Sequence, residues 1–152
     1  MVLVQYVEQL TVSLRWWVQG TMLVATLWFA IAVAIPSILA AALISLGALA
    51  LMATCLLMYG AARIVVGDGQ LRAGRARIDL SYVGAAEALD AEGTRRVAGV
   101  DADARAYLLL RPYLKRSVRI EITDPSDPTP YWLVCTRHPD RLVAALAAVT
   151  TP

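Results

Sequence analysis

The chain has 152 residues, 59% of them hydrophobic, and its 14 basic and 12 acidic side chains leave a net charge of +2. So small a positive charge excludes the electrostatic signature of a nucleic-acid-binding protein. The two cysteines do not indicate a disulfide framework, so free thiols in a reducing compartment are the simpler interpretation.

Residues 1–15 allow two interpretations. Leu3, Leu10 and Leu14 suit one face of an interfacial helix, whereas residues 11–14 alternate as a strand does. We treat residues 1–15 as an N-terminal interfacial segment and leave its secondary structure open.

Residues 16–62 contain no Asp, Glu, Lys, Arg or His. As one helix they would extend about 70 Å, more than twice the ~30 Å hydrocarbon core of a bilayer. We therefore predict a transmembrane helical hairpin with spans at residues 16–35 and 38–59. An Ala-Val-Ala sequence at residues 32–34 resembles a signal-peptidase site, but a second full-length span follows directly, which favours an uncleaved anchor.

Small residues lie four apart on both spans near the turn. Such stripes let helix backbones approach closely in lipid, which predicts tight packing within the hairpin or between two copies of it. The abundance of alanine explains the stripes equally well. The predicted packing residues are Thr26, Ala30, Ala34, Ser37, Ala41 and Ser45.

Arginines flank the outer ends of the hairpin, while its turn carries no charge. Arg15 precedes the first span, and Arg63 and three further arginines follow the second within about 20 residues. Cytoplasmic segments carry the excess of Lys and Arg in membrane proteins. We therefore expect a multi-pass plasma-membrane protein with its N- and C-termini in the cytoplasm.

Beyond residue 62 the sequence changes to short alternating segments separated by turn signals, which predicts strands. Local capping signals predict a short helix at residues 91–98, and Pro139 begins a C-terminal helix that extends to about residue 149. Residues 63–152 are thus predicted to form a small, mostly-β domain of about seven antiparallel strands and a C-terminal helix, in the order of a pleckstrin-homology-like (PH-like) barrel. The strands are expected at residues 63–66, 70–73, 75–80, 85–89, 106–110, 117–123 and 131–137.

Several motifs resemble one known family. They are DGQLRAG at residues 68–74, RAY at 105–107, the proline-rich segment from Thr123 to Val134, and TRHP at 136–139, together with Tyr6 and Glu8. On these residues the chain resembles the actinobacterial family of small double-span membrane proteins of unknown function. The resemblance covers nearly the whole chain. It implies a plasma-membrane protein with a cytoplasmic domain similar to bacterial pleckstrin-homology modules, and it implies no reaction.

No catalytic set of residues can be assembled from the sequence. Cys135 and His138 are predicted as a strand residue and a helix cap, which favours structural roles over a nucleophile–base pair. Many relatives would have Ser in place of Cys135, which argues against a required thiol. Asp101 and Asp103 have the spacing of a metal-binding pair, but their surroundings favour a polar surface loop. We therefore expect no enzyme, no cofactor, no metal and no small-molecule substrate.

Two basic groups and one aromatic pair are the candidate contact residues. The first basic group follows the membrane segment, where lipid or phosphate contact is possible, and the second occupies a loop between strands, where pleckstrin-homology domains hold phosphate headgroups. If the strand at 131–137 alternates, one member of the aromatic pair faces outward as a protein contact. The first group is Arg72, Arg75 and Arg77, the second is Arg111, Lys115, Arg116 and Arg119, and the aromatic pair is Tyr131 and Trp132.

The resulting prediction is a membrane-anchored cytoplasmic interaction module, either an adaptor or an accessory subunit. Its expected partners are membrane lipids and another membrane or peripheral protein, or a second copy of the chain, with no nucleic acid. The alternative is a domain that binds anionic lipids at the inner leaflet through its arginine groups.

Overall fold

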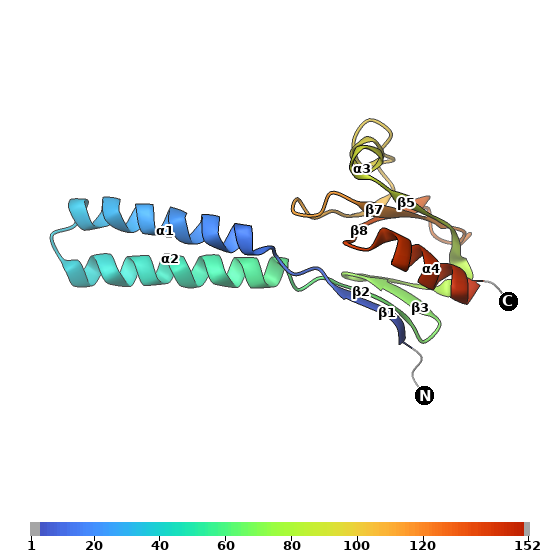
Figure 1. The fold of residues 1–152 in the computed structure, drawn as a ribbon, viewed down its shortest axis with the longest axis horizontal. Helices are drawn as coiled ribbons and strands as arrows, with labels where there is room; N and C mark the ends of the chain where they lie inside the picture. Colours follow the sequence, from blue (N-terminus) through green and yellow to red (C-terminus); the bar gives the residue numbers. More distant parts are fainter. Residues whose placement is uncertain (1–3, 151–152) are drawn as a thin grey trace. The chain divides into compact units, whose positions relative to one another are not determined.

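The computed structural model describes residues 4–150, which form a helical hairpin and a β domain (Figure 1). The hairpin lies within Thr11–Ala61, and the β domain uses the chain on both sides of it. The helices of the hairpin are α1 (Leu14–Ala34) and α2 (Ile38–Tyr59). The elements of the β domain are β1 (Val4–Gln9), β2 (Arg63–Gly67), β3 (Gln70–Ala73), β4 (Ala76–Asp79), η1 (Leu80–Tyr82), β5 (Val83–Leu89), α3 (Ala91–Ala98), β6 (Tyr107–Leu109), β7 (Ser117–Ile122), β8 (Tyr131–Cys135) and α4 (Pro139–Thr150).

Both helices of the hairpin are long and apolar enough to cross a membrane. Their bounds lie close to those predicted for the two spans. The chain reverses at Pro36 and Ser37, where proline cannot continue the first helix. The Ser37 hydroxyl then accepts a hydrogen bond from the Ala40 N–H, at 3.4 Å, and caps the second helix.

Within one hairpin, only two of the six predicted packing residues are buried. On α2, Ala41 and Ser45 are buried, and the Ser45 hydroxyl donates to the Ala41 carbonyl at 2.8 Å. On α1, the predicted residues Thr26, Ala30 and Ala34 are all exposed, as is Ser37 at the turn. The less exposed positions of α1 are Trp16, Trp17, Gly20, Val24 and Ile31, so within one hairpin the small-residue stripe of this helix does not face α2.

The first sheet has the strand order β1-β2-β3-β4, and its pairs are antiparallel. It corrects the prediction for the N-terminus, because β1 is an edge strand of this sheet and not a separate interfacial segment. Leu10 is fully buried, and its N–H donates to the Ala62 carbonyl at 2.9 Å. The β domain therefore includes the described residues before the hairpin as well as those after it.

The second sheet has the order β5-β7-β8-β6, and β6 pairs with β8 in parallel. The described residues thus form eight strands in two sheets, not seven antiparallel strands. The predicted closed barrel is also wrong, because no strand pairing among the described residues joins the two sheets. Instead the chain passes from β4 to β5 through the short helix η1.

Helix α4 packs against both sheets and contributes to their shared core (Figure 1). One face of this helix is apolar: Leu142 and Leu146 are fully buried, and Val143 and Val149 pack beside the core. Asp140 lies in the first turn, where a negative charge is favoured by the helix dipole. This helix therefore holds a fixed position beside β1, the edge strand of the first sheet.

Candidate functional site

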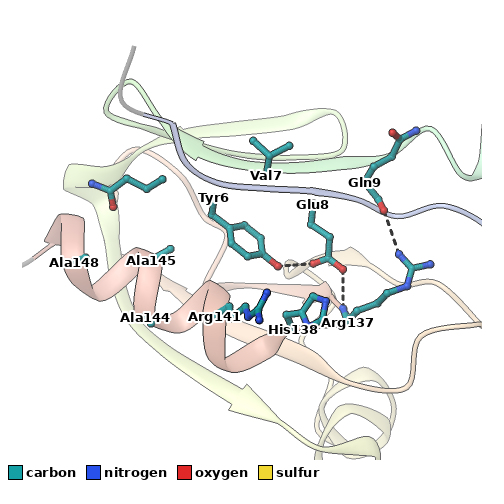
Figure 2. Close-up of a pocket in the computed structure, with 11 residues that line it drawn as sticks. Tyr6, Val7, Glu8, Gln9, Arg137, His138, Arg141, Ala144, Ala145 and Ala148 are labelled. Atoms are coloured by element: carbon teal, nitrogen blue, oxygen red, sulfur yellow. Dashed lines mark hydrogen bonds between the residues drawn. The ribbon is translucent and has the colours of Figure 1, made fainter. Parts of the chain in front are cut away.

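Glu8 is a buried carboxylate at the place where β1 meets the start of α4 (Figure 2). Its Oε2 accepts hydrogen bonds from the Tyr6 hydroxyl, at 2.6 Å, and from the Thr136 hydroxyl. Its Oε1 accepts from the backbone N–H of Arg137 at 2.9 Å. Thr136 in turn accepts from the His138 N–H at 3.0 Å. A buried carboxylate is costly unless its oxygens are hydrogen-bonded, and this network provides those partners.

Tyr6 serves this network as a hydrogen-bond donor. Burial, followed by the hydrogen bond to Glu8, raises the pKa of the phenol from 10.0 to about 12. Both causes disfavour the phenolate, because it would be a poorly hydrated anion beside a carboxylate. The hydroxyl therefore keeps its proton, and its bond to Glu8, throughout the physiological pH range.

Arg137 closes one end of the space between β1 and α4. Its guanidinium donates to the Gln9 carbonyl at 3.2 Å, while its own carbonyl accepts from the Arg116 guanidinium at 3.1 Å. Arg137 therefore contacts β1 twice: its backbone N–H binds Glu8, and its side chain binds Gln9. The connection between β8 and α4 is thereby fixed to the N-terminal strand at several points.

A groove of about 820 Å³ lies between β1 and α4 (Figure 2). On the helix side its wall consists of the small residues Ala144, Ala145 and Ala148, which leave space that longer side chains would fill. We call this space the β1–α4 groove. Its lining residues are Gln5, Tyr6, Val7, Glu8, Gln9, Arg137, His138, Arg141, Ala144, Ala145 and Ala148.

The strand side of the groove is an open sheet edge. In an antiparallel ladder, alternate residues direct their N–H and C=O groups to opposite sides of the strand. The Leu10 N–H bonds to Ala62, so the backbone groups of Leu10 and Glu8 point toward β2 and form the ladder. The N–H and C=O groups of Val7 and Gln9 therefore point to the open side of the strand. The Gln9 carbonyl binds Arg137. Within residues 4–150, no partner reaches the N–H and C=O of Val7.

The accessible charge of the groove is positive. Its charged side chains are Glu8, Arg137 and Arg141, of which Glu8 is buried in its own hydrogen-bond network. Arg141 is exposed, and within the described part of the chain it forms no ion pair. An incoming acidic group would therefore meet an available guanidinium at this end of α4.

The first basic group forms a continuous exposed surface. Arg72 on β3 and Arg77 on β4 are directly opposite each other, and Arg75 lies in the turn between the two strands. All three side chains are exposed. Arg63, at the start of β2, is exposed on the same sheet.

Three members of the second basic group have separate structural partners. Arg116 bonds to the Arg137 carbonyl, and the Arg119 guanidinium lies 4.6 Å from the centre of the Tyr131 ring, in a cation–π contact. Arg111 is partly buried and donates to the Leu110 carbonyl at 3.3 Å. Lys115 is exposed.

The predicted aromatic contact is wrong, because Tyr131 and Trp132 are both only 4% exposed. Strand β8 lies between β7 and β6, and both of its faces are covered, so alternation along it exposes neither ring. Trp132 packs against Tyr107 with 5.1 Å between ring centres. Tyr131 lies under Arg119, and its hydroxyl accepts from the Asp103 N–H at 3.0 Å.

Cys135 and His138, the two residues considered as a nucleophile and a base, are engaged in contacts that hold the fold together. Cys135 is buried, which raises the pKa of its thiol, and it donates to the Leu114 carbonyl at 3.9 Å. A thiol held protonated is a poor nucleophile. His138 is exposed, and its backbone N–H is engaged by Thr136.

The two aspartates with metal-binding spacing point to different partners. Asp103 pairs with Arg105 at 3.0 Å, which lowers the pKa of that carboxyl to about 2. Asp101 pairs with Arg96 at 3.3 Å. No group of three or more potential metal ligands gathers anywhere in the described part of the chain.

Sequence reasoning missed the groove and the Glu8 network. The resemblance had included Tyr6, Glu8 and the TRHP motif at residues 136–139, but nothing in the sequence joined two segments more than 100 residues apart. The position of Glu8 in the sequence could have indicated a buried polar network. Glu8 lies between Tyr6 and Leu10 at an inward-facing register position, where a charged residue requires buried partners.

The fold and the groove define a class of small proteins in which one β domain is assembled from both sides of an apolar helical hairpin. Residues 5–146 match a family described as "Protein of unknown function (DUF3093)", and the chain belongs to this family. The matched region begins in β1 and ends in α4, so it includes every residue that lines the groove except Ala148. No curated protein and no solved structure matched the chain.

Proposed function

We propose that this protein is a membrane-anchored cytoplasmic interaction module, an adaptor or accessory subunit, that binds an extended segment of another protein in the β1–α4 groove. The observation that carries the proposal is the open backbone edge at Val7, which faces an alanine-lined helix across the groove. In β-augmentation, an extended peptide adds a strand to such an edge, and its side chains occupy adjacent pockets.

The chemistry of the groove favours an acidic segment. A peptide paired with Val7 would lie beside α4, where Arg141 has no carboxylate partner among the described residues. Guanidinium groups form strong, often bidentate hydrogen bonds with carboxylates. The register shift at Gln5 ends regular pairing on one side, and Arg137 covers the Gln9 carbonyl on the other, so the paired segment is short.

The Glu8 network supports this function by holding the two walls apart at a fixed distance. Glu8 joins β1 to Thr136 and Arg137, directly before α4. A preformed groove loses less conformational entropy when it binds than a mobile one does.

The anchoring part of the proposal follows from chain connectivity. Strands β1 and β2 pair in one sheet, so both ends of the hairpin enter the same folded domain. If α1 and α2 span the membrane, the whole β domain lies on one side of it. The arginines that follow α2 favour the cytoplasmic side.

Site-specific photo-crosslinking in native membranes tests the groove. A benzophenone side chain is placed at Ala148, in the groove, or at Ala91, an exposed control position on α3. The full-length protein should give a discrete adduct from Ala148 and none from Ala91. Equal labelling from both positions, or from neither, contradicts the proposal.

Two further substitutions separate strand addition from chance proximity. Val7→Pro removes the outward N–H but no hydrogen bond to β2, because proline is tolerated at a sheet edge when its nitrogen faces outward. Val7→Ala keeps that N–H and serves as the matched control. The adduct should disappear with Val7→Pro and weaken with Arg141→Glu, yet persist with Val7→Ala. An adduct that survives Val7→Pro contradicts β-augmentation.

A further inference from the structure

The outward face of the first sheet is electrically polarised along its strands. At one end, Arg63 begins β2, and Arg75 occupies the turn between β3 and β4. These two positions are adjacent, because the Gly74 N–H donates to the Arg63 carbonyl at 2.9 Å. At the other end, Asp68 lies in the β2–β3 turn and Asp79 ends β4. The two ends are separated by about 14 Å, or four residues of extended strand.

Arg72 and Arg77 extend the positive end along the sheet. They are paired directly across β3 and β4, and like charges in that position destabilise a sheet. Arg72 approaches the neutral amide of Gln70 at 3.5 Å. Arg77 lines a small cavity together with Asp79, Asp124 and Asp127, but within residues 4–150 neither arginine forms an ion pair. We call Arg63, Arg72, Arg75 and Arg77 the basic end of the first sheet.

Chain connectivity limits how far Arg63, at the basic end, can lie from the end of α2. Arg63 follows Tyr59, the last residue of α2, by four residues, which span at most about 14 Å when fully extended. On the neighbouring strand, Gln9 pairs with Arg63 and precedes Leu14, where α1 begins. The acidic end is the end of the sheet farther along the chain from both helices.

We infer that the basic end of the first sheet binds the anionic headgroups of the leaflet in which the hairpin is anchored. This inference rests on the proposed anchoring but not on the groove, which is formed by other side chains. Chain length holds Arg63 within at most about 14 Å of the end of α2. Basic residues close to an anionic leaflet are attracted by its negative surface potential, which decays within about one Debye length. The like-charge pair of Arg72 and Arg77, which forms no ion pair within the described part of the chain, then acquires phosphate partners.

Fluorescence quenching in reconstituted vesicles tests the contact with the full chain. Val65 lies beside Arg72 on the outward face and is replaced by Cys, in a background where Cys55 and Cys135 are Ser. The thiol carries an environment-sensitive fluorophore, and a spin label on a lipid headgroup is the quencher. Vesicles contain phosphatidylcholine alone or phosphatidylcholine with phosphatidylglycerol.

Quenching should be strong with phosphatidylglycerol, weak without it, and relieved by high salt. Quenching gives the ratio of protein whose first sheet contacts the headgroups to protein whose sheet does not. Arg77→Glu should lower this ratio at least fivefold, as expected for the loss of one basic contact. The control Arg95→Glu, on the exposed surface of α3, should leave the ratio unchanged. Equal quenching in both vesicles, or an equal effect of the two substitutions, overturns the inference.

Two control measurements keep the result interpretable. Arg77→Gln should not lower the unfolding temperature in zwitterionic detergent, because it removes a repulsion; a large fall would assign the arginine a folding role and contradict the inference. Carbonate extraction should leave the chain in the vesicles. Extraction of the chain would contradict the anchoring itself, whereas quenching that is independent of lipid charge in a retained chain contradicts only the leaflet contact.

Discussion

The carboxylate of Glu8 accepts a hydrogen bond from the backbone N–H of Arg137, a residue 129 positions away, at 2.9 Å. This bond joins the edge strand that precedes the hairpin to the segment that begins the last helix. Because Glu8 also accepts from Tyr6 and Thr136, its removal leaves several polar groups without a partner.

Glu8→Ala should destabilise the β domain by about 2–4 kcal/mol, since it leaves buried donors unsatisfied. Denaturant titration in detergent measures this loss, with Trp132 fluorescence as the probe and the tryptophans of the hairpin replaced by Phe. The control Glu87→Ala removes an exposed glutamate on β5 and should change the free energy of unfolding by less than about 0.5 kcal/mol. Equal effects of the two substitutions would show that the Glu8 network is not stabilising.

Tyr6 should make stability depend on pH in the alkaline range. The pKa of its phenol is about 12 in the folded protein, against 10.0 when unperturbed. The unfolded chain therefore loses this proton first, so the contribution of Tyr6 to stability is complete below pH 10 and declines as the pH rises to 12. Absorbance of tyrosinate should show one transition near pH 12 that Tyr6→Phe removes. Persistence of that transition in the variant would contradict the burial of this phenol.

The β domain should fold without its hairpin when β1 is retained. The Leu10 N–H and the Ala62 carbonyl are 2.9 Å apart, so a short Gly-rich linker can replace residues 11–61. This linked protein should give a dispersed NMR spectrum in water. A fragment that begins at Ala62 should not, because it lacks β1 together with Glu8 and the fully buried Leu10. Equal spectra from the two proteins would contradict the assignment of β1 to this domain.

Trp132→Ala should be among the most destabilising single substitutions in the β domain, at about 3–5 kcal/mol, because it leaves a cavity beside Tyr107 in the core. Tyr82→Ala removes an aromatic ring that is 39% exposed and should cost far less. Thermal unfolding followed by near-ultraviolet circular dichroism compares the two variants. A small effect at Trp132 would restore the surface role that the sequence suggested.

Local signals in the sequence predict the helices well. The absence of charge from residues 16–62 dictates the hairpin, because so long an apolar segment has few alternatives. The bounds predicted for α3 agree with the structure, since Asp90 caps it by accepting from the Gly93 N–H at 2.7 Å and Gly99 follows its last residue. Capping is a short-range interaction and can be recognised without knowledge of the fold.

Non-local relationships could not be predicted in this way. Strand β1 was obscured because Glu8 interrupts the expected apolar positions, and its burial depends on Thr136 and Arg137. The parallel pairing of β6 with β8 likewise depends on contacts distant in sequence. Tyr131 is covered by Arg119, a residue whose exposed appearance in the sequence suggested lipid contact instead. The groove arises from these same long-range contacts.

The pairing of β1 with β2 also constrains how the protein is made. Strand β1 leaves the ribosome before the hairpin, yet its partner emerges only after both helices have been synthesised. In a membrane-inserted chain, failure of one helix to cross would leave β1 and β2 on opposite sides of the bilayer, and the first sheet could not form. The β domain can therefore fold completely only after both helices have inserted correctly, because only then are β1 and β2 on the same side of the membrane.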